Sequence, residues 1–226
     1  MALALFDLDN TLLHGDSDYA WGQFLITVGA VDREIYEHVN RAFYDDYKAG
    51  RLDIATFLAF ALAPLTRYPR AQLVAWRATF VQEHIRPIIK SWAPSVLERY
   101  RDRGDTLALV TATNSFVTGP IADLLGVPHL IATIPEERNG QFTGNFQGTP
   151  CFREGKVERV NAWVAEHQLS WENSSFYSDS HNDLPLLEAV SRPVAVDPDP
   201  TLLAVAKKRG WEILMSDTMK LAEHTE

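Results

Sequence analysis

The amino-acid sequence predicts an α/β protein in which a doubly wound, parallel, five-stranded sheet carries an inserted bundle of helices. Three observations predict this fold: short apolar runs, helical patterns between most of them, and one long segment that is helical throughout. The apolar runs lack two-residue alternation, which is typical of parallel strands covered on both faces. They are residues 3–6, 106–110, 129–133, 175–178 and 193–196.

Helical patterns connect these strands, as the βαβ units of a doubly wound sheet require. Gly104 is placed as the stop signal of the first of them. The four patterns cover residues 94–104, 116–126, 154–169 and 182–190.

One segment, from about Ser17 to Ile89, contains no convincing strand. Asp53 is placed to cap one of its helices, and Gly50 follows another. Its four helical patterns cover residues 18–30, 32–50, 53–65 and 70–87. We therefore expect a helical domain over residues 17–89, inserted into an α/β domain made of residues 1–16 and 90–226.

Two further patterns concern the hairpin and the aromatic residues. Asn139-Gly140, between extended residues, predicts a β-hairpin near residues 133–147. The aromatic residues of the insert are expected to form its core. They are Trp21, Phe24, Tyr36, Phe43, Tyr44, Phe57, Phe60, Trp76 and Phe80.

Composition narrows the functional class. The net charge of −9 argues against a nucleic-acid partner, which requires a basic surface. Cys151 is the only cysteine, so we expect no disulfide and no redox role. No apolar run is long enough to span a membrane, and no basic region precedes the first apolar run, so a cytoplasmic location is expected. The sequence does not indicate an oligomeric state.

Small polar residues follow three of the predicted strands. They are the stretches Asp7-Leu8-Asp9-Asn10-Thr11, Thr111-Ala112-Thr113-Asn114 and Asp179-Ser180-His181-Asn182-Asp183. Ligands of open parallel sheets bind beyond the carboxyl ends of the strands. Together with Lys156, which starts a helix after a glycine, these stretches predict one shared site.

These motifs resemble those of the haloacid dehalogenase superfamily, in particular its phosphatases, and they occur in the family's order. The resemblance implies that Asp7 is the nucleophile and that Thr111, with neighbouring backbone N–H groups such as that of Ala112, and Lys156 bind the phosphoryl group. It also implies a Mg²⁺ ion held by the Asp7 carboxylate, the Asp9 carbonyl and Asp179. Asp183 would support the metal site directly or through water.

Asp9 distinguishes between reactions within this superfamily. Hydrolysis of a phosphomonoester needs a proton for the leaving alkoxide and then a base for the attacking water, and one carboxyl group can serve both steps. Dehalogenases of the superfamily lack this second aspartate, and its transport ATPases have threonine there. Asp9 therefore favours a phosphatase, or a phosphotransferase or mutase. A non-catalytic binding protein is disfavoured by the complete set of charged groups.

The substrate is less constrained by the sequence. A helical insert between the first two motifs is, by resemblance, a cap that selects the substrate, as in phosphoserine phosphatases. The stretches "DNTLLHGDSDYAWGQFL", "LVTATN" and "RPVAVDPDP" look closer to bacterial histidinol-phosphate phosphatases. Asp16 and Asp18 suit a substrate amine, although they could equally cap a helix. A small aminated phosphate ester is therefore the expected partner, with phosphoserine as the alternative to histidinol phosphate.

Overall fold

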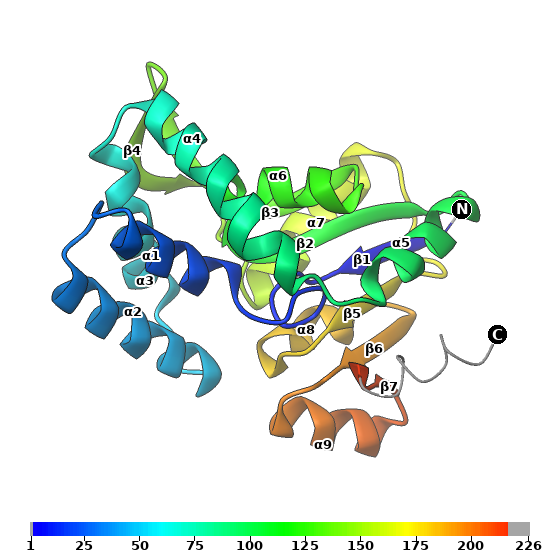
Figure 1. Cartoon of the computed structure of the whole chain (residues 1–226). Coiled ribbons are helices and arrows are strands. Elements are labelled where there is room, and N and C mark those ends of the chain that lie inside the picture. The colour runs from blue at the N-terminus through cyan, green and yellow to red at the C-terminus, as the bar shows by residue number, and fades with distance from the viewer. Residues whose placement is uncertain (1, 217–226) are drawn as a thin grey trace.

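The computed structural model describes residues 2–216, and within them one seven-stranded sheet forms the centre of the molecule (Figure 1). The strand order is β4-β3-β2-β1-β5-β6-β7, and every neighbouring pair is parallel except β3 and β4. The strands are β1 (Leu3–Phe6), β2 (Thr106–Asn114), β3 (His129–Arg138), β4 (Gln141–Gln147), β5 (Ser175–Ser178), β6 (Arg192–Val196) and β7 (Glu212–Leu214).

The five predicted strands are all present, and two more join them within the described residues. β4 is the second strand of the predicted hairpin, whose turn residues Asn139 and Gly140 both have positive φ angles. β7 was not predicted, because three partly exposed residues at the sheet edge are too short to carry a pattern. β2 is also longer than predicted and continues to Asn114.

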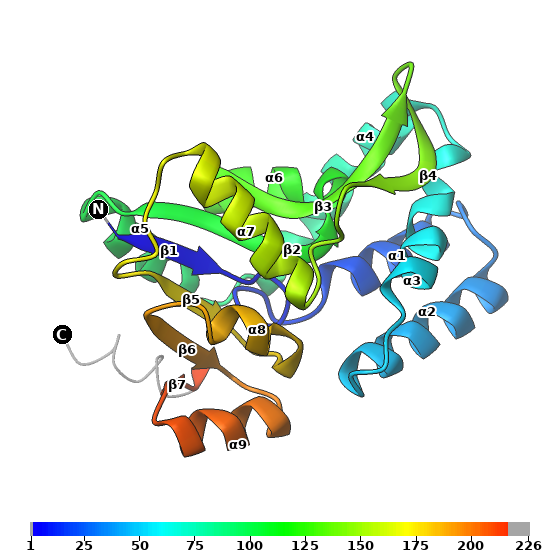
Figure 2. The ribbon, with the colours of Figure 1, turned by 180° about the vertical axis from the view of Figure 1, so that it is seen from behind.

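Helices cover both faces of the sheet, as a doubly wound fold requires. In β1, Phe6 packs into the apolar cluster under α5 (Ala93–Asp102) and α6 (Ser115–Leu125), while Leu5 packs into the cluster on the other face. Figures 1 and 2 show these opposite faces. The helices of the second face are α7 (Glu154–Glu166), α8 (Leu184–Leu187) and α9 (Pro200–Arg209), with a 3₁₀ turn at His181–Asp183.

The segment between β1 and α5 is helical, as predicted. Asp53 caps α3 with its side chain, and Gly50 follows α2 with a φ of +67°. The helices are α1 (Ser17–Thr27), α2 (Arg33–Lys48), α3 (Ile54–Leu62) and α4 (Arg70–Phe80), with 3₁₀ turns at Ala63–Thr66 and Arg86–Ile88 and a π turn at Val81–Ile85. The fourth predicted pattern, over residues 70–87, is α-helical as far as Phe80 and continues as the π and 3₁₀ turns to Ile88. The domain boundaries at residues 17 and 89 stay a prediction.

The β3–β4 hairpin extends from the sheet to the inserted helices (Figure 2). Arg70 of α4 lies 2.6 Å from the Glu137 carboxylate, and its guanidinium lies 4.5 Å from the centre of the Phe142 ring. The hairpin therefore packs against the inserted helices. No helix within residues 2–216 is long and apolar enough to cross a membrane.

Candidate active site

Asp7 lies immediately after β1, and its backbone N–H extends the pairing with β5 by donating to the Tyr177 carbonyl at 2.9 Å. Its side chain is only 5 % exposed. Burial raises the pKa of the Asp7 carboxyl to about 7, although Lys156 lowers it. Its Oδ1 accepts a hydrogen bond from Lys156 Nζ at 2.8 Å. Asp7 is therefore a carboxylate held in low dielectric beside a fixed cation.

Lys156 comes from the first turn of α7 and is 3 % exposed. Its Nζ lies 2.8 Å from Asp183 Oδ2, which also accepts a hydrogen bond from Ser178 Oγ. Burial opposes the charge on Lys156, but Asp183 and Asp7 outweigh it and raise the pKa of the amine. Lys156 is therefore a cation that two aspartates hold in position.

Gly155 makes this placement of Lys156 possible. A Cβ atom at residue 155 would lie 2.1 Å from the Pro150 carbonyl oxygen, well inside van der Waals contact. Only glycine allows the first turn of α7 to approach the preceding loop this closely. The glycine before Lys156 in the sequence thus sets how deeply the lysine enters the site.

Asp9 is held by hydrogen bonds from two other elements. Its Oδ1 accepts from the Ser17 backbone N–H at 2.6 Å, and its Oδ2 accepts from Thr113 Oγ1 at 2.9 Å. Burial, and then the neighbouring Asp16, raise the pKa of Asp9 to about 6. A carboxyl group with this pKa can both give and take a proton near neutral pH.

The residues of the predicted phosphate-binding segment at the end of β2 differ in their access to the pocket. Thr111 is fully buried, and its hydroxyl accepts from the Thr113 N–H at 3.2 Å and contacts Asp9 Oδ2 at 3.4 Å. Ala112 and Thr113 line the pocket. Thr113 was not predicted as a site residue, although it is the second threonine of the same "TATN" stretch and would lie on the same side of the strand as Thr111.

Asp179 lies at the end of β5 and is connected to the first motif through Thr11. Its Oδ1 accepts from Thr11 Oγ1 at 3.1 Å, and its N–H donates to the same hydroxyl at 3.0 Å. Burial and the nearby Asp7 and Asp183 raise the pKa of Asp179 well above its usual range. Three close carboxylates with a single lysine leave an excess of negative charge, which a divalent cation would neutralise.

The structure agrees only in part with the predicted set of Mg²⁺ ligands. The Asp7 and Asp179 carboxylates are hard oxygen donors, and the Asp9 carbonyl belongs to the second residue after Asp7. Asp183 already accepts hydrogen bonds from Lys156 and Ser178, which favours a supporting role for it. Within residues 2–216, no three His, Cys, Asp or Glu side chains converge closely enough to hold an ion by themselves. A backbone carbonyl and waters would have to complete the coordination.

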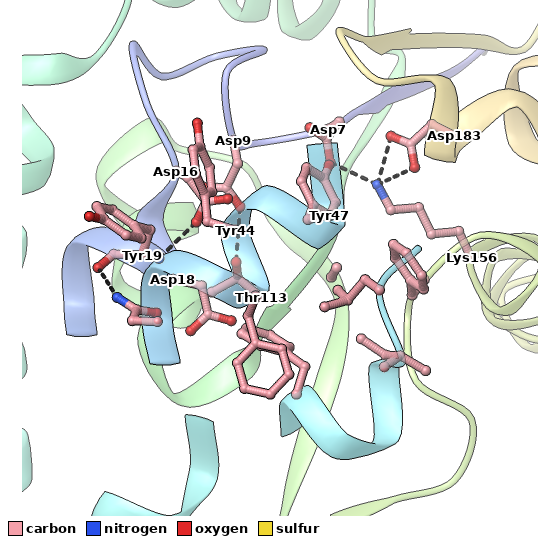
Figure 3. Close-up of a pocket in the computed structure, with 17 residues that line it drawn as sticks. Asp7, Asp9, Asp16, Asp18, Tyr19, Tyr44, Tyr47, Thr113, Lys156 and Asp183 are labelled. Carbon is pink, nitrogen blue, oxygen red and sulfur yellow. Dashed lines mark hydrogen bonds and ion pairs between the residues drawn. The ribbon is translucent and has the colours of Figure 1, made fainter. Parts of the chain in front are cut away.

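A pocket extends from Asp7, Asp9, Lys156 and Asp183 to the inserted helices, and neither Thr111 nor Asp179 is among its described lining residues (Figure 3). Asp18 lies at its far end, whereas Asp16 lies beside Asp9 and caps α1 by accepting from the Tyr19 N–H at 2.8 Å. The pKa values of both carboxyls are raised by burial. The lining residues are Asp7, Asp9, Asp16, Asp18, Tyr19, Asn40, Phe43, Tyr44, Tyr47, Leu52, Ile54, Phe57, Ala112, Thr113, Phe152, Lys156 and Asp183.

One wall of this pocket is a face of α2, formed by Asn40, Phe43, Tyr44 and Tyr47. These positions follow the i, i+3, i+4, i+7 spacing of a single helix face. The expectation that the aromatic residues of the insert form its core is incomplete, because Phe43, Tyr44 and Phe57 also line the pocket. It holds for Trp21, Phe24, Tyr36 and Phe80, which are buried. Periodicity alone cannot separate a face turned toward a core from one turned toward a ligand.

Cys151 and His181 are both held away from the reacting groups. Cys151 is fully buried, and burial raises the pKa of its thiol to about 12, so it has no thiolate to react. His181 is not directed at a metal. Its Nδ1 lies 2.7 Å from Asp199 Oδ2, and the opposite edge of its ring packs against Gly50.

Comparison with known proteins identifies the family. The profile of the haloacid dehalogenase-like hydrolases (HAD) matches residues 4–188. The chain belongs to this family. Among curated HAD relatives, a histidinol-phosphatase of Neisseria meningitidis is 45% identical over 216 residues, covering 94% of this chain and 97% of the relative. A phosphoserine phosphatase of Mycobacterium tuberculosis is 33% identical, covering 94% of this chain and 70% of the relative.

Solved structures agree with this assignment to the HAD fold. A protein of unknown function from Bordetella pertussis is 48% identical, with a TM-score of 0.89, and the match covers 94% of this chain and 97% of that one. A substrate-bound phosphoserine phosphatase is 17% identical with a TM-score of 0.71, covering 100% and 98%, and so shares the fold. The family, the phosphatase relatives and the site agree that this protein is a phosphoric monoester hydrolase.

Proposed function

We propose that this phosphatase hydrolyses the phosphate ester of a small aminated metabolite, with histidinol phosphate as its substrate. The observation that carries the proposal is the distribution of charge along the pocket. Lys156 is the only cationic side chain among the described lining residues, and it is held by Asp7 and Asp183. The far end carries Asp18 among aromatic rings, and Asp16 lies between this carboxylate and the reacting groups, beside Asp9.

This distribution favours histidinol phosphate over phosphoserine. Phosphoserine has a carboxylate as well as an amine, and a buried carboxylate needs a cationic partner. Histidinol phosphate has an amine and an imidazole, which suit carboxylates and aromatic faces. None of the arginines of the insert is among the described residues that line the pocket. They are Arg33, Arg41, Arg51, Arg67, Arg70, Arg77 and Arg86. The name of the relative from Neisseria supports the same substrate.

The proposed reaction proceeds through an aspartyl-phosphate. The Asp7 carboxylate attacks phosphorus while the ester P–O bond breaks, and Asp9 gives its proton to the leaving alkoxide. Asp9 then takes a proton from water, whose oxygen attacks phosphorus and releases phosphate and the Asp7 carboxylate. Lys156 and the backbone N–H groups after β2 stabilise the charge on the phosphoryl oxygens, while the Thr113 hydroxyl orients Asp9.

Asp7, Asp179 and the Asp9 carbonyl are the groups that would hold Mg²⁺. When bound, the ion neutralises charge on the phosphoryl oxygens and reduces their repulsion of Asp7. Asp183 keeps Lys156 oriented, and Thr11 keeps Asp179 beside the first motif.

The experiment is a comparison of kcat/KM for histidinol phosphate and phosphoserine in the presence of Mg²⁺. We expect histidinol phosphate to be favoured by at least about 10²-fold, since phosphoserine leaves a buried charge unpaired. A preference for phosphoserine would overturn the substrate assignment. The relative from Mycobacterium tuberculosis is named as a phosphatase of that substrate. Transfer of phosphate to an added alcohol in preference to water would indicate a phosphotransferase. The cytoplasmic location stays a prediction.

A further inference from the structure

The phosphoryl end of the pocket is closed in this structure. Asp7, Lys156 and Asp183 are each at most 5 % exposed, so a substrate phosphate cannot reach them without movement of a wall. Among the pocket walls, α2 is the weakly packed one. Of its sixteen residues only Tyr36 and Asn40 are buried. Elements with few buried apolar contacts are those that open at the lowest cost.

Two residues of the α/β part hold the C-terminal end of α2 against the site. Arg153 Nη2 donates to the Gly50 carbonyl at 2.5 Å, and Asn182 Nδ2 donates to the Tyr47 carbonyl at 3.1 Å. The two residues also bond to each other, since Arg153 Nε donates to Asn182 Oδ1 at 3.1 Å. A cation beside the last carbonyls of a helix is also favoured by the helix dipole.

Both holding residues are adjacent to the catalytic groups. Asn182, which is 3 % exposed, precedes Asp183, and Arg153 precedes the helix that carries Lys156. Figure 3 shows the Tyr47 side chain reaching from α2 toward Asp7. The position of α2 is therefore connected by direct hydrogen bonds to the segments that place Lys156 and Asp183.

The backbone of Arg153 has a strained conformation, and the contacts of its side chain account for it. Its φ is +50° and its ψ is −122°, a conformation that favours glycine. Strained residues persist where the surrounding contacts require them, and they gather at functional sites. Here the strained residue is the one whose side chain joins Gly50, Asn182 and α7.

We infer that Arg153 and Asn182 form a polar latch that positions α2 over the phosphoryl site, and that substrate entry and product release require this latch to open. The inference rests on the proposed function, because it takes Asp7 as the reacting group. When the latch opens, its polar groups can bond to water instead, so opening costs less than exposing a packed apolar contact, which suits a wall that must open in every turnover.

Hydrogen exchange on Arg153→Met tests the latch directly. We expect amides of residues 41–50 to exchange at least about 10-fold faster, the loss expected of one charge-assisted hydrogen bond. Arg209→Met is the matched control, because Arg209 pairs with Glu188 on the surface away from α2. Unchanged exchange at 41–50, or equal acceleration in the control, would overturn the latch.

Kinetics and two further substitutions separate positioning from folding. We expect Arg153→Met to lower kcat about 10-fold with a smaller change in KM, and Arg153→Lys to recover part of it, because lysine can still reach the Gly50 carbonyl. Arg153→Gly should have a higher Tm than Arg153→Met but the same fast exchange. If the native protein releases no phosphate from any ester, the proposed function fails while the exchange experiment still decides the latch.

Discussion

The two ends of the pocket are built differently. At the phosphoryl end, the side chains come from residues directly after strands or from the first turn of α7, and each is held by at least one hydrogen bond to another element. At the far end, the groups come from α1, α2 and α3. The phosphoryl end is therefore held by hydrogen bonds between segments that follow different strands, whereas the far end is built from helices of the insert.

This difference teaches how one scaffold can combine a fixed reaction with a changeable substrate. Phosphoryl transfer depends on placing charges to within a fraction of an ångström, which rigid strand ends can do. Substrate choice depends on the shape and charge of a wall, which can change without disturbing the strands. Substitutions at the two ends should therefore have different signatures.

The largest effect is expected from Asp7→Asn. This change removes the nucleophile and should lower kcat by about 10⁴-fold or more for every ester, whatever its leaving group. Phosphate release measures it. Because burial already disfavours the Asp7 charge, Tm should not fall. Turnover close to that of the native protein would show that Asp7 is not the nucleophile.

Gly155→Ala should have the next largest effect, although it changes no charged group. The added methyl group would meet the Pro150 carbonyl and displace the first turn of α7 with Lys156. A displacement of about 1 Å can cost about 10²-fold in rate. Gly119→Ala is the control, because it also lies in a helix and its Cβ would meet nothing within 4 Å. Equal kcat values for the two variants would contradict this account of Lys156.

Asp18→Asn should affect the far end of the pocket alone. We expect kcat/KM for histidinol phosphate to fall about 10- to 100-fold, the loss of a hydrogen bond to a charged group, with little change for p-nitrophenyl phosphate, which has no amine. Asp16→Asn is informative beside it, because asparagine caps helices as well as aspartate does. Asp32→Asn, at the exposed cap of α2, is the control. Equal losses for both substrates would place Asp18 in folding or chemistry.

The smallest effect concerns stability and pH. The pKa values of Asp7 and Asp9 are raised to about 7 and about 6, above the ordinary 3.8. The folded protein therefore keeps these protons longer than the unfolded chain, so the free energy of unfolding should fall as pH rises from 4 to 7. In chelator-treated protein we expect Tm to fall by several degrees over this range.

Two comparisons control this stability prediction. Asp197 and Asp199, whose pKa values are lowered, titrate below this window and should not contribute. Asp9→Asn should flatten the Tm profile. A rising Tm in metal-free protein between pH 4 and 7 would contradict the raised pKa values.

The sequence predicted the phosphoryl end more completely than the far end for a physical reason. Asp7, Asp9, Thr111 and Asp179 follow apolar strands, and parallel strands bring their carboxyl ends to one edge. The wall of α2 could not be predicted in the same way, because Phe43 and Tyr44 have the periodicity of a core face. The latch residue Arg153 gave no signal, since its left-handed backbone is visible only in the structure.

The burial of Cys151 also makes this molecule convenient for spectroscopy. Because its thiol is enclosed and has a pKa of about 12, it should not react with a maleimide dye in the folded protein. Ile35, on α2, is 69 % exposed. An Ile35→Cys variant would therefore take one label at one place, and the emission of that label could follow the movement of α2 during turnover in real time.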